Sequence, residues 1–118
     1  MQTDTKSRID QTTSPSGQPV TVLRFEGDIS SVSKEAVIGS YQSLSKTTVK
    51  TVLLDFTKVE YINSSGIALV IQLLMQASKT GDGVAIFGLT PHFQKVFTMV
   101  GITKYAHIYA DEAAATAV

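Results

Sequence analysis

The run Val52-Leu53-Leu54-Asp55-Phe56, followed shortly by Ile62-Asn63-Ser64-Ser65-Gly66-Ile67, decides the fold of this chain. An apolar run of this length is typical of a strand that is covered on both faces, as in a parallel sheet. We expect the strand to end at the carboxylate of Asp55, which would bond nearby backbone amides. A short loop should follow, and then a helix over residues 64–79 that Asn63 or a serine caps. The buried side of this helix should hold Ile67, Val70, Ile71 and Leu74.

Before this segment, the sequence indicates a hairpin and a first helix. Strands are expected over residues 7–13 and 20–27, joined by a turn rich in Pro, Gly and Ser. Gly27-Asp28 should break the second strand. A helix should then run to about Lys46, and its cap would be Ser30, Ser31 or Ser33. The buried side of that helix should hold Val37, Tyr41 and Leu44.

After the central segment, strands and helices continue to alternate. We expect a strand over residues 84–87, a helix from Pro91 to Gly101, an edge strand over residues 107–109 and a short helix over residues 111–117. The core side of the Pro91 helix should hold Phe93, Val96, Phe97 and Val100. The alternation predicts an α/β fold, with a mixed β-sheet of four to five strands and about four helices packed mainly on one face.

Composition favours a small globular protein. The 118 residues suit a single domain over residues 1–118, with residues 1–6 as a flexible N-terminus. The 10 basic and 10 acidic residues give a formal net charge of zero. The sequence has no cluster of basic residues, so it does not indicate a nucleic-acid partner. The absence of cysteine excludes disulfides and thiolate metal sites and fits a reducing compartment. The longest apolar stretch, residues 67–75, is too short to span a membrane, so we expect a cytoplasmic protein with no membrane partner.

The start of the helix after the central strand is the strongest candidate for a functional site. Binding sites gather at this end of the strands in α/β folds. A helix N-terminus presents free backbone amides and the positive end of the helix dipole, so a phosphate placed there is favoured. Ser64 and Ser65 stand at this position. The alternative is that Asn63 or a serine only caps the helix.

Three stretches carry a family resemblance. They are residues 25–29, then residues 53–56 with 62–66, and finally residues 87–91 with 96–97 and 100–102. Their order and spacing together resemble the STAS domain, of the kind found in bacterial anti-sigma factor antagonists. The resemblance covers roughly residues 7–114. It implies the α/β fold expected above and a protein that works by binding other proteins.

The resemblance also implies a switch that is operated by phosphorylation. In antagonists, a partner kinase that is also the anti-sigma factor phosphorylates a serine at the start of the second helix, and a phosphatase reverses the modification. The unphosphorylated form binds the kinase and frees the sigma factor. Ser64 matches the phosphate acceptor, and Ser65 is the alternative. The implied partner-binding surface comprises Asp28, Ser30, Ser31, Asn63, Ser64, Ser65 and Gly66.

Two positions depart from the antagonist pattern. Asn63 stands where antagonists usually carry Asp before the acceptor, and Ser30 stands where they often carry Asp after the second strand. Both changes remove a carboxylate from beside the acceptor, so a phosphate is easier to hold there. They also remove groups that could orient the hydroxyl for a kinase. A second hypothesis therefore stays open: a STAS scaffold, or a module that senses a nucleotide or another small ligand without a phospho-switch.

The sequence does not indicate catalysis. No nucleophile and base are paired by spacing, and His92 and His107 lie in separate expected elements. Gly81-Asp82-Gly83 resembles a tight turn and lacks the layout of a phosphate loop. We therefore expect a binding protein with no catalytic residue, no metal and no cofactor.

Overall fold

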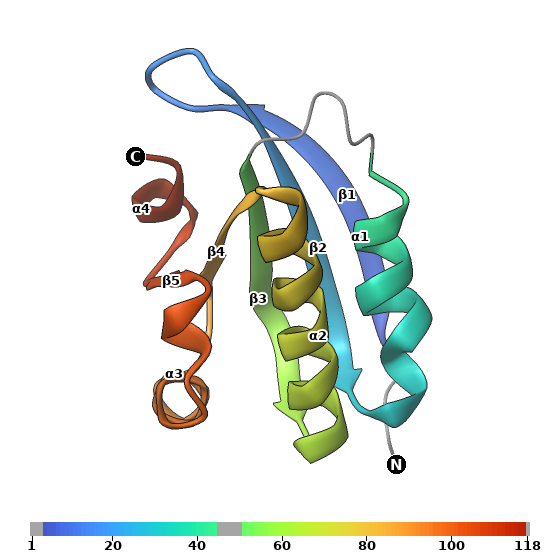
Figure 1. Ribbon diagram of the computed structural model, residues 1–118. Helices are drawn as coiled ribbons and strands as arrows, with labels where there is room; N and C mark the ends of the chain where they lie inside the picture. The colour runs from blue at the N-terminus through green and yellow to red at the C-terminus, as the bar shows by residue number, and fades with distance from the viewer. Residues whose placement is uncertain (1–3, 45–50, 118) are drawn as a thin grey trace.

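Five strands form one sheet in the computed structural model, which describes residues 4–44 and 51–117 (Figure 1). They are β1 (Lys6–Thr13), β2 (Pro19–Ile29), β3 (Thr51–Ile62), β4 (Gly83–Phe87) and β5 (His107–Tyr109), and they lie in the order β1-β2-β3-β4-β5. The pair β1 and β2 is an antiparallel hairpin, whereas β2 to β5 run parallel to one another. This confirms the mixed sheet that the sequence predicts.

Helical segments connect the strands in the expected order. They are the 3₁₀ turn η1 (Ser31–Ser33), the π-helical turn η2 (Glu35–Gly39), α1 (Ser40–Gln42), α2 (Ser64–Thr80), α3 (Pro91–Met99), the 3₁₀ turn η3 (Ile102–Lys104) and α4 (Glu112–Thr116). Asn63 caps the start of α2, and Gly81, with a φ of 81°, ends that helix in the left-handed conformation. Pro91 is the first residue of α3. An amide hydrogen at this position would have no acceptor within the helix, so a proline there costs no hydrogen bond.

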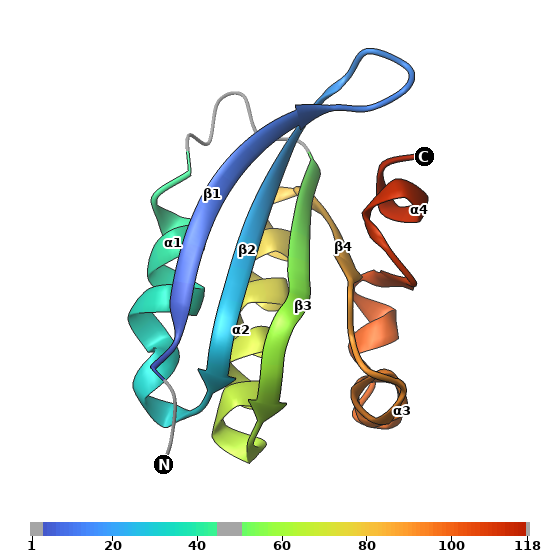
Figure 2. The same cartoon turned by 180° about the vertical axis from the view of Figure 1, so that it is seen from behind.

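Apolar side chains are buried on both faces of the sheet, but mainly on one. Helices α1, α2 and α3 pack on one face, where Figure 1 shows α1 and α2 in front of the strands. The core on this face includes Phe25, Phe56 and Phe97, none of which is more than 2% exposed. The opposite face, turned to the viewer in Figure 2, carries a smaller buried cluster that α4 joins: Val20, Val22, Leu53, Ala85, Phe87 and Ala115.

Two expectations about strand ends are wrong. Strand β3 does not end at Asp55 but continues to Ile62, so no loop precedes the helix cap. Strand β2 passes through Gly27 and ends at Ile29. The two extensions pair with each other, and register shifts after Arg24 and after Gly27 keep the long strands together. The candidate site therefore lies at the end of a continuous pair of strands.

The first helix is less regular than expected. Ser30 caps a 3₁₀ turn, a π-helical turn follows, and only Ser40–Gln42 are α-helical. A run of valine, isoleucine and glycine in the middle of the segment has low helix propensity, which explains the irregularity. The expected end near residue 46 lies outside the described residues. Val37, Tyr41 and Leu44 are buried as predicted.

Two smaller details also differ from the expectations. Val100 is 48% exposed, because α3 ends at Met99 and the chain then turns. Residues 1–3 lie outside the described part of the chain, but Lys6 already begins β1. The Thr5 hydroxyl donates a hydrogen bond to the Asp28 carbonyl oxygen, so the N-terminal segment is held from Thr5 onward.

Candidate functional site

The start of α2 is built from one capping residue and two exposed serines. Asn63 Oδ1 accepts a hydrogen bond from the Gly66 amide at 2.9 Å, and the Asn63 carbonyl oxygen accepts one from the Ile67 amide at 2.9 Å. Ser64 and Ser65 are the first two residues of the helix, and both are exposed. The first amides of a helix have no partner inside it, so those of Ser64 and Ser65 are available at the surface.

Gly66 fixes this helix start against β2. A Cβ atom at this position would lie 2.3 Å from the Ile29 carbonyl oxygen, so only glycine fits without a shift of backbone. The Asn63 amide donates to the same carbonyl oxygen at 3.1 Å. Ser64 and Ser65 therefore lie on a helix whose start is in close contact with the sheet, and not on a loop.

Ser30 and Ser33 stabilise the turn that follows β2. Ser33 Oγ accepts a hydrogen bond from the Ser30 amide at 2.8 Å, and the Val32 amide donates to Ser30 Oγ at 3.5 Å. The Thr5 hydroxyl adds a hydrogen bond with Ser33. Ser30 is only 4% exposed, so its hydroxyl lies beneath the surface and stabilises the turn.

The structure gathers the seven predicted site residues where β2 ends and α2 begins, with different exposures. Two are buried and shape the surface from beneath: Ser30 and Gly66. Two are half-buried: Asp28 and Asn63. Three form part of the surface itself: Ser31, Ser64 and Ser65.

Two exposed apolar side chains at this end of the sheet were not predicted. Val32 in η1 is 76% exposed, and Tyr61 near the end of β3 is 55% exposed. The Tyr61 ring lies edge-on to Phe93 of α3, with ring centroids 6.3 Å apart. A signal for Val32 was present in the sequence, because an apolar residue between serines in a turn has no core to enter. The place of Tyr61 depends on the extension of β3, which no local signal indicated.

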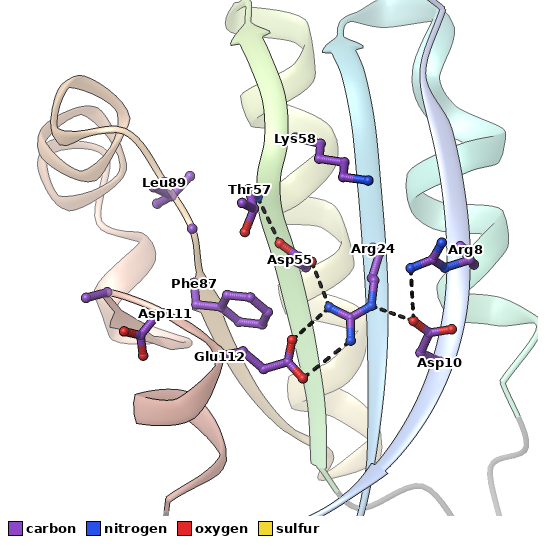
Figure 3. Close-up of a pocket in the computed structure, with 12 residues that line it drawn as sticks. Arg8, Asp10, Arg24, Asp55, Thr57, Lys58, Phe87, Leu89, Asp111 and Glu112 are labelled. Carbon is purple, nitrogen blue, oxygen red and sulfur yellow. Dashed lines mark hydrogen bonds and ion pairs between the residues drawn. The ribbon is translucent and has the colours of Figure 1, made fainter.

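A second candidate site lies on the opposite face of the sheet, around Arg24 (Figure 3). Its guanidinium donates to three carboxylates: Asp10 at 2.5 Å, Asp55 at 2.9 Å and Glu112 at 2.9 and 3.3 Å. Asp55 also accepts a hydrogen bond from the Thr57 amide at 2.8 Å, as the sequence predicted for this carboxylate. The network itself was missed, because the partners of Arg24 lie 14, 31 and 88 residues away along the chain.

The ion pairs of this network stabilise the charged forms of Asp10 and Arg24. The hydrogen bond from Arg24 is the main cause that lowers the pKa of Asp10 below its usual value of 3.8. The hydrogen bond to Glu112 is the main cause that raises the pKa of Arg24, although burial opposes it. The network borders a cavity of about 640 Å³, whose wall also includes Lys58 and Phe87. This volume is within the range of small-ligand sites, but the cavity is open to solvent along much of its surface.

Other kinds of site are not seen in the described part of the chain. Across residues 4–44 and 51–117, no helix combines the length and apolar character that crossing a membrane requires. No three acidic or histidine side chains of these residues are placed to hold a metal ion. The two histidines lie apart, His92 beside Phe93 on α3 and His107 beside Tyr109 on β5.

The order of elements and the capped helix start define a class of small α/β domain. The sequence matches the STAS domain over residues 11–115, so this chain belongs to the STAS domain family. Its structure is similar to that of an anti-sigma factor antagonist from Mycobacterium paratuberculosis, with a TM-score of 0.72 and 15% identity, over 95% of this chain and 91% of that chain. It is also similar to the Bacillus cell fate determinant SpoIIAA in its phosphorylated form, with a TM-score of 0.66 and 18% identity, over 92% and 96% of the two chains. The family and fold expected from the sequence are confirmed.

The same fold also occurs inside a much larger protein. The chain is similar to part of the murine anion transporter Slc26a9, with a TM-score of 0.70 and 13% identity, over 99% of this chain but 22% of that chain. Identities this low establish the shared fold alone. Because one fold serves different functions, the function of this chain has to be argued from its own surface.

Proposed function

We propose that this protein is an anti-sigma factor antagonist, which binds a serine kinase through the start of α2 and is released when Ser64 is phosphorylated. The kinase would be an anti-sigma factor with a histidine-kinase-like fold, and a phosphatase would restore the unphosphorylated form. The protein would regulate transcription in the cytoplasm, by binding and without turnover of its own. The observation that carries this proposal is an exposed Ser64 at a capped helix start of a STAS domain.

Ser64 can carry a phosphate without loss of the local structure. Asn63 supplies the cap and Gly66 supplies the close contact with β2, so neither role depends on the Ser64 side chain. The first turn of α2 contains no acidic residue, and the helix dipole favours a negative group there. A similar protein, SpoIIAA, has solved structures in both its unphosphorylated and its phosphorylated form, which supports such a switch on this fold.

Phosphorylation would weaken partner binding through local charge. A phosphate adds about −1.5 to −2 charges at pH 7 to the proposed interface. A partner surface that fits a neutral hydroxyl would then bury an unpaired charge, which is strongly unfavourable. No change of fold is needed for release.

The first prediction concerns Ser64→Asp and Ser64→Ala. Ser64→Ala protein used as bait should retain a serine kinase, which is then purified and titrated by calorimetry. Ser64→Asp should bind this kinase at least about tenfold more weakly than the parent, because it places a negative charge in the interface. Incubation with the kinase, ATP and magnesium should phosphorylate the parent at Ser64, as read by phosphosite mapping.

Ser65→Ala is the matched control, because Ser65 is exposed beside Ser64 on the same turn. It should be phosphorylated and should bind like the parent. Phosphate found only at Ser65 would move the acceptor by one residue and keep the mechanism. Equal affinity of the parent, the phosphorylated protein and Ser64→Asp would contradict the switch.

The cavity around Arg24 supports a second candidate function, a STAS module that senses a nucleotide or another small ligand. The cavity lies on the face of the sheet opposite α2 and is bordered by side chains of both charges. The same titrations separate the two candidates. A sensing or scaffold module would keep its partner after Ser64→Asp, whereas an antagonist would lose it.

A further inference from the structure

The region around Ser64 is unusual in its lack of charge. Residues 61–78, between Glu60 and Lys79, contain no Asp, Glu, Lys or Arg. Charged residues make up 17% of the chain, so a stretch of this length would ordinarily hold about three. A helix face exposed to water usually carries charged side chains opposite its apolar stripe. The outer face of α2 therefore differs from an ordinary solvated helix surface.

The exposed residues of α2 between Ser64 and Met75 form one continuous stripe. Ser64, Ala68, Gln72 and Met75 are exposed and follow one another at intervals of four, four and three residues, with Ser65 beside them. Residues at this spacing lie on the same side of a helix. Met75 is 47% exposed, and beyond it the exposed side of α2 continues through Ser78 to Lys79, where the charge-free stretch ends.

The turn after β2 extends this stripe at the helix start. Turn η1 packs against α2, and the Asn63 amide is bonded to the Ile29 carbonyl oxygen just before that turn. Figure 1 shows the chain leaving β2 beside the first turn of α2. Ser31 and Val32 of η1 are both exposed, so a second exposed apolar side chain lies on the turn that packs against α2.

From these observations we infer that α2 and η1 form a neutral docking face for an uncharged, partly apolar surface of a partner protein. The neutral face consists of Ser31, Val32, Ser64, Ser65, Ala68, Gln72 and Met75. Val32 and Met75 are its apolar anchors, and Ser64 is the first residue of α2. This inference rests on the proposed function, since it assumes that the partner binds at Ser64. It extends the contact along α2 well beyond the helix start.

The lack of charge on this face excludes partner surfaces that are strongly charged. A partner patch rich in lysine or arginine would find no carboxylate on this face, and an acidic patch would find no cation. Charged residues border the face at its margins: Asp28, which is half-buried, and the exposed Lys34, Glu35 and Lys79. A phosphate on Ser64 would then be the only strong charge on the face. The affinity of the partner would thus depend on the phosphorylation of Ser64 and would change little with ionic strength.

The second prediction tests this inference by adding charge of each sign at Met75. The kinase retained by the Ser64→Ala bait is titrated with Met75→Lys and with Met75→Glu. Both variants should bind at least about tenfold more weakly than the parent, because an uncharged partner surface desolvates either charge without pairing it. The affinity of the parent should change less than about threefold between 50 and 500 mM salt.

Met99→Lys is the matched control for Met75→Lys. Met99 is 79% exposed on α3 and does not belong to the neutral face. Met99→Lys should bind the kinase like the parent, and thermal melts should show that all three variants are folded. Tighter binding by Met75→Lys or by Met75→Glu would show that the partner surface is charged and would overturn the inference.

The result at Ser64 separates failure of this inference from failure of the proposed function. If Ser64→Asp weakens binding but both Met75 variants bind like the parent, the switch stands and the extended neutral face is wrong. If no kinase is retained, or if Ser64→Asp has no effect, the proposed function fails and the inference fails with it. Loss of binding in Met99→Lys as well would place the contact elsewhere and would also overturn the neutral face.

Discussion

At the scale of single residues, the candidate site depends on a glycine that cannot be replaced without a shift of backbone. Gly66 lies in the first turn of α2, where alanine would ordinarily be preferred by about 1 kcal/mol. The Ile29 carbonyl oxygen occupies the space that a methyl group would need. The position of Ser64 is therefore set by backbone packing two residues away in the same turn, and not by contacts of its own side chain.

The third prediction is that Gly66→Ala destabilises the protein by about 1–3 kcal/mol, because the added Cβ would force the helix start away from β2. Urea unfolding monitored by circular dichroism measures this difference.

Gly39→Ala is the control for that substitution. A Cβ at Gly39 would meet only the end of the flexible Glu35 side chain, and its φ of −61° suits any residue. It should therefore be neutral or stabilising by up to about 1 kcal/mol. An unchanged urea midpoint in Gly66→Ala would show that β2 and α2 are not in close contact.

At the scale of elements, α4 is held to the sheet by one buried residue and one ion pair. Ala115 is 1% exposed and packs into the small cluster with Leu53 and Phe87. Glu112 at the first position of α4 binds Arg24 through both carboxylate oxygens. A helix of this length has little stability of its own, so these contacts decide whether it forms.

The fourth prediction is that Glu112→Gln loosens α4 without loosening the sheet. The side chain of Glu112 is 39% exposed, so solvent screening limits the ion pair to about 0.5–1 kcal/mol. Hydrogen exchange at the Ala115 amide, which is bonded to the Asp111 carbonyl oxygen, should therefore rise by about two- to fivefold. Amides of β2, β3 and β4 should keep their exchange rates.

Glu60→Gln provides the comparison for this change. It removes an exposed carboxylate that forms no ion pair with any residue in the described part of the chain. Exchange in α4 should stay at the parent rate in this variant. Equal rates in Glu112→Gln and the parent would show that α4 does not depend on Arg24.

At the scale of the whole molecule, a row of aromatic rings joins the sheet to the helix layer. Phe25 and Phe56 on neighbouring strands have ring centroids 5.5 Å apart, and Phe56 meets Phe97 of α3 edge-on at 5.8 Å. Phe97 is fully buried, so it links α3 to the same core that fixes α2. The candidate site at the start of α2 and the fold as a whole therefore depend on the same core.

The fifth prediction is that Phe97→Ala costs about 3–5 kcal/mol, because it removes a buried ring and leaves a cavity. This is a large part of the stability of a small domain. Urea titration measures the free energy of unfolding of each variant. Met99→Ala on the same helix should change this free energy by less than about 0.5 kcal/mol, because Met99 is exposed. A Phe97→Ala midpoint equal to that of the parent would place the ring outside the core.

The sequence by itself determined the order of the elements and the start of α2. The apolar run at residues 52–54, the Asn63 cap and the stop at Gly81 act within a few residues, so their effects can be derived without knowledge of distant parts. The same local signals placed Ser64 at an exposed helix start.

Tertiary structure alone decided how far the strands run, which site residues are exposed, and what holds Arg24. Strand β3 continues past Asp55 because β2 pairs with it through a shifted register. Ser30 is buried because the end of β2, η1 and α2 meet around it, which leaves Val32 at the surface. The partners of Arg24 come from β1, β3 and α4. Each of these features is a contact between segments far apart in the chain, and such contacts are fixed by packing rather than by local preference.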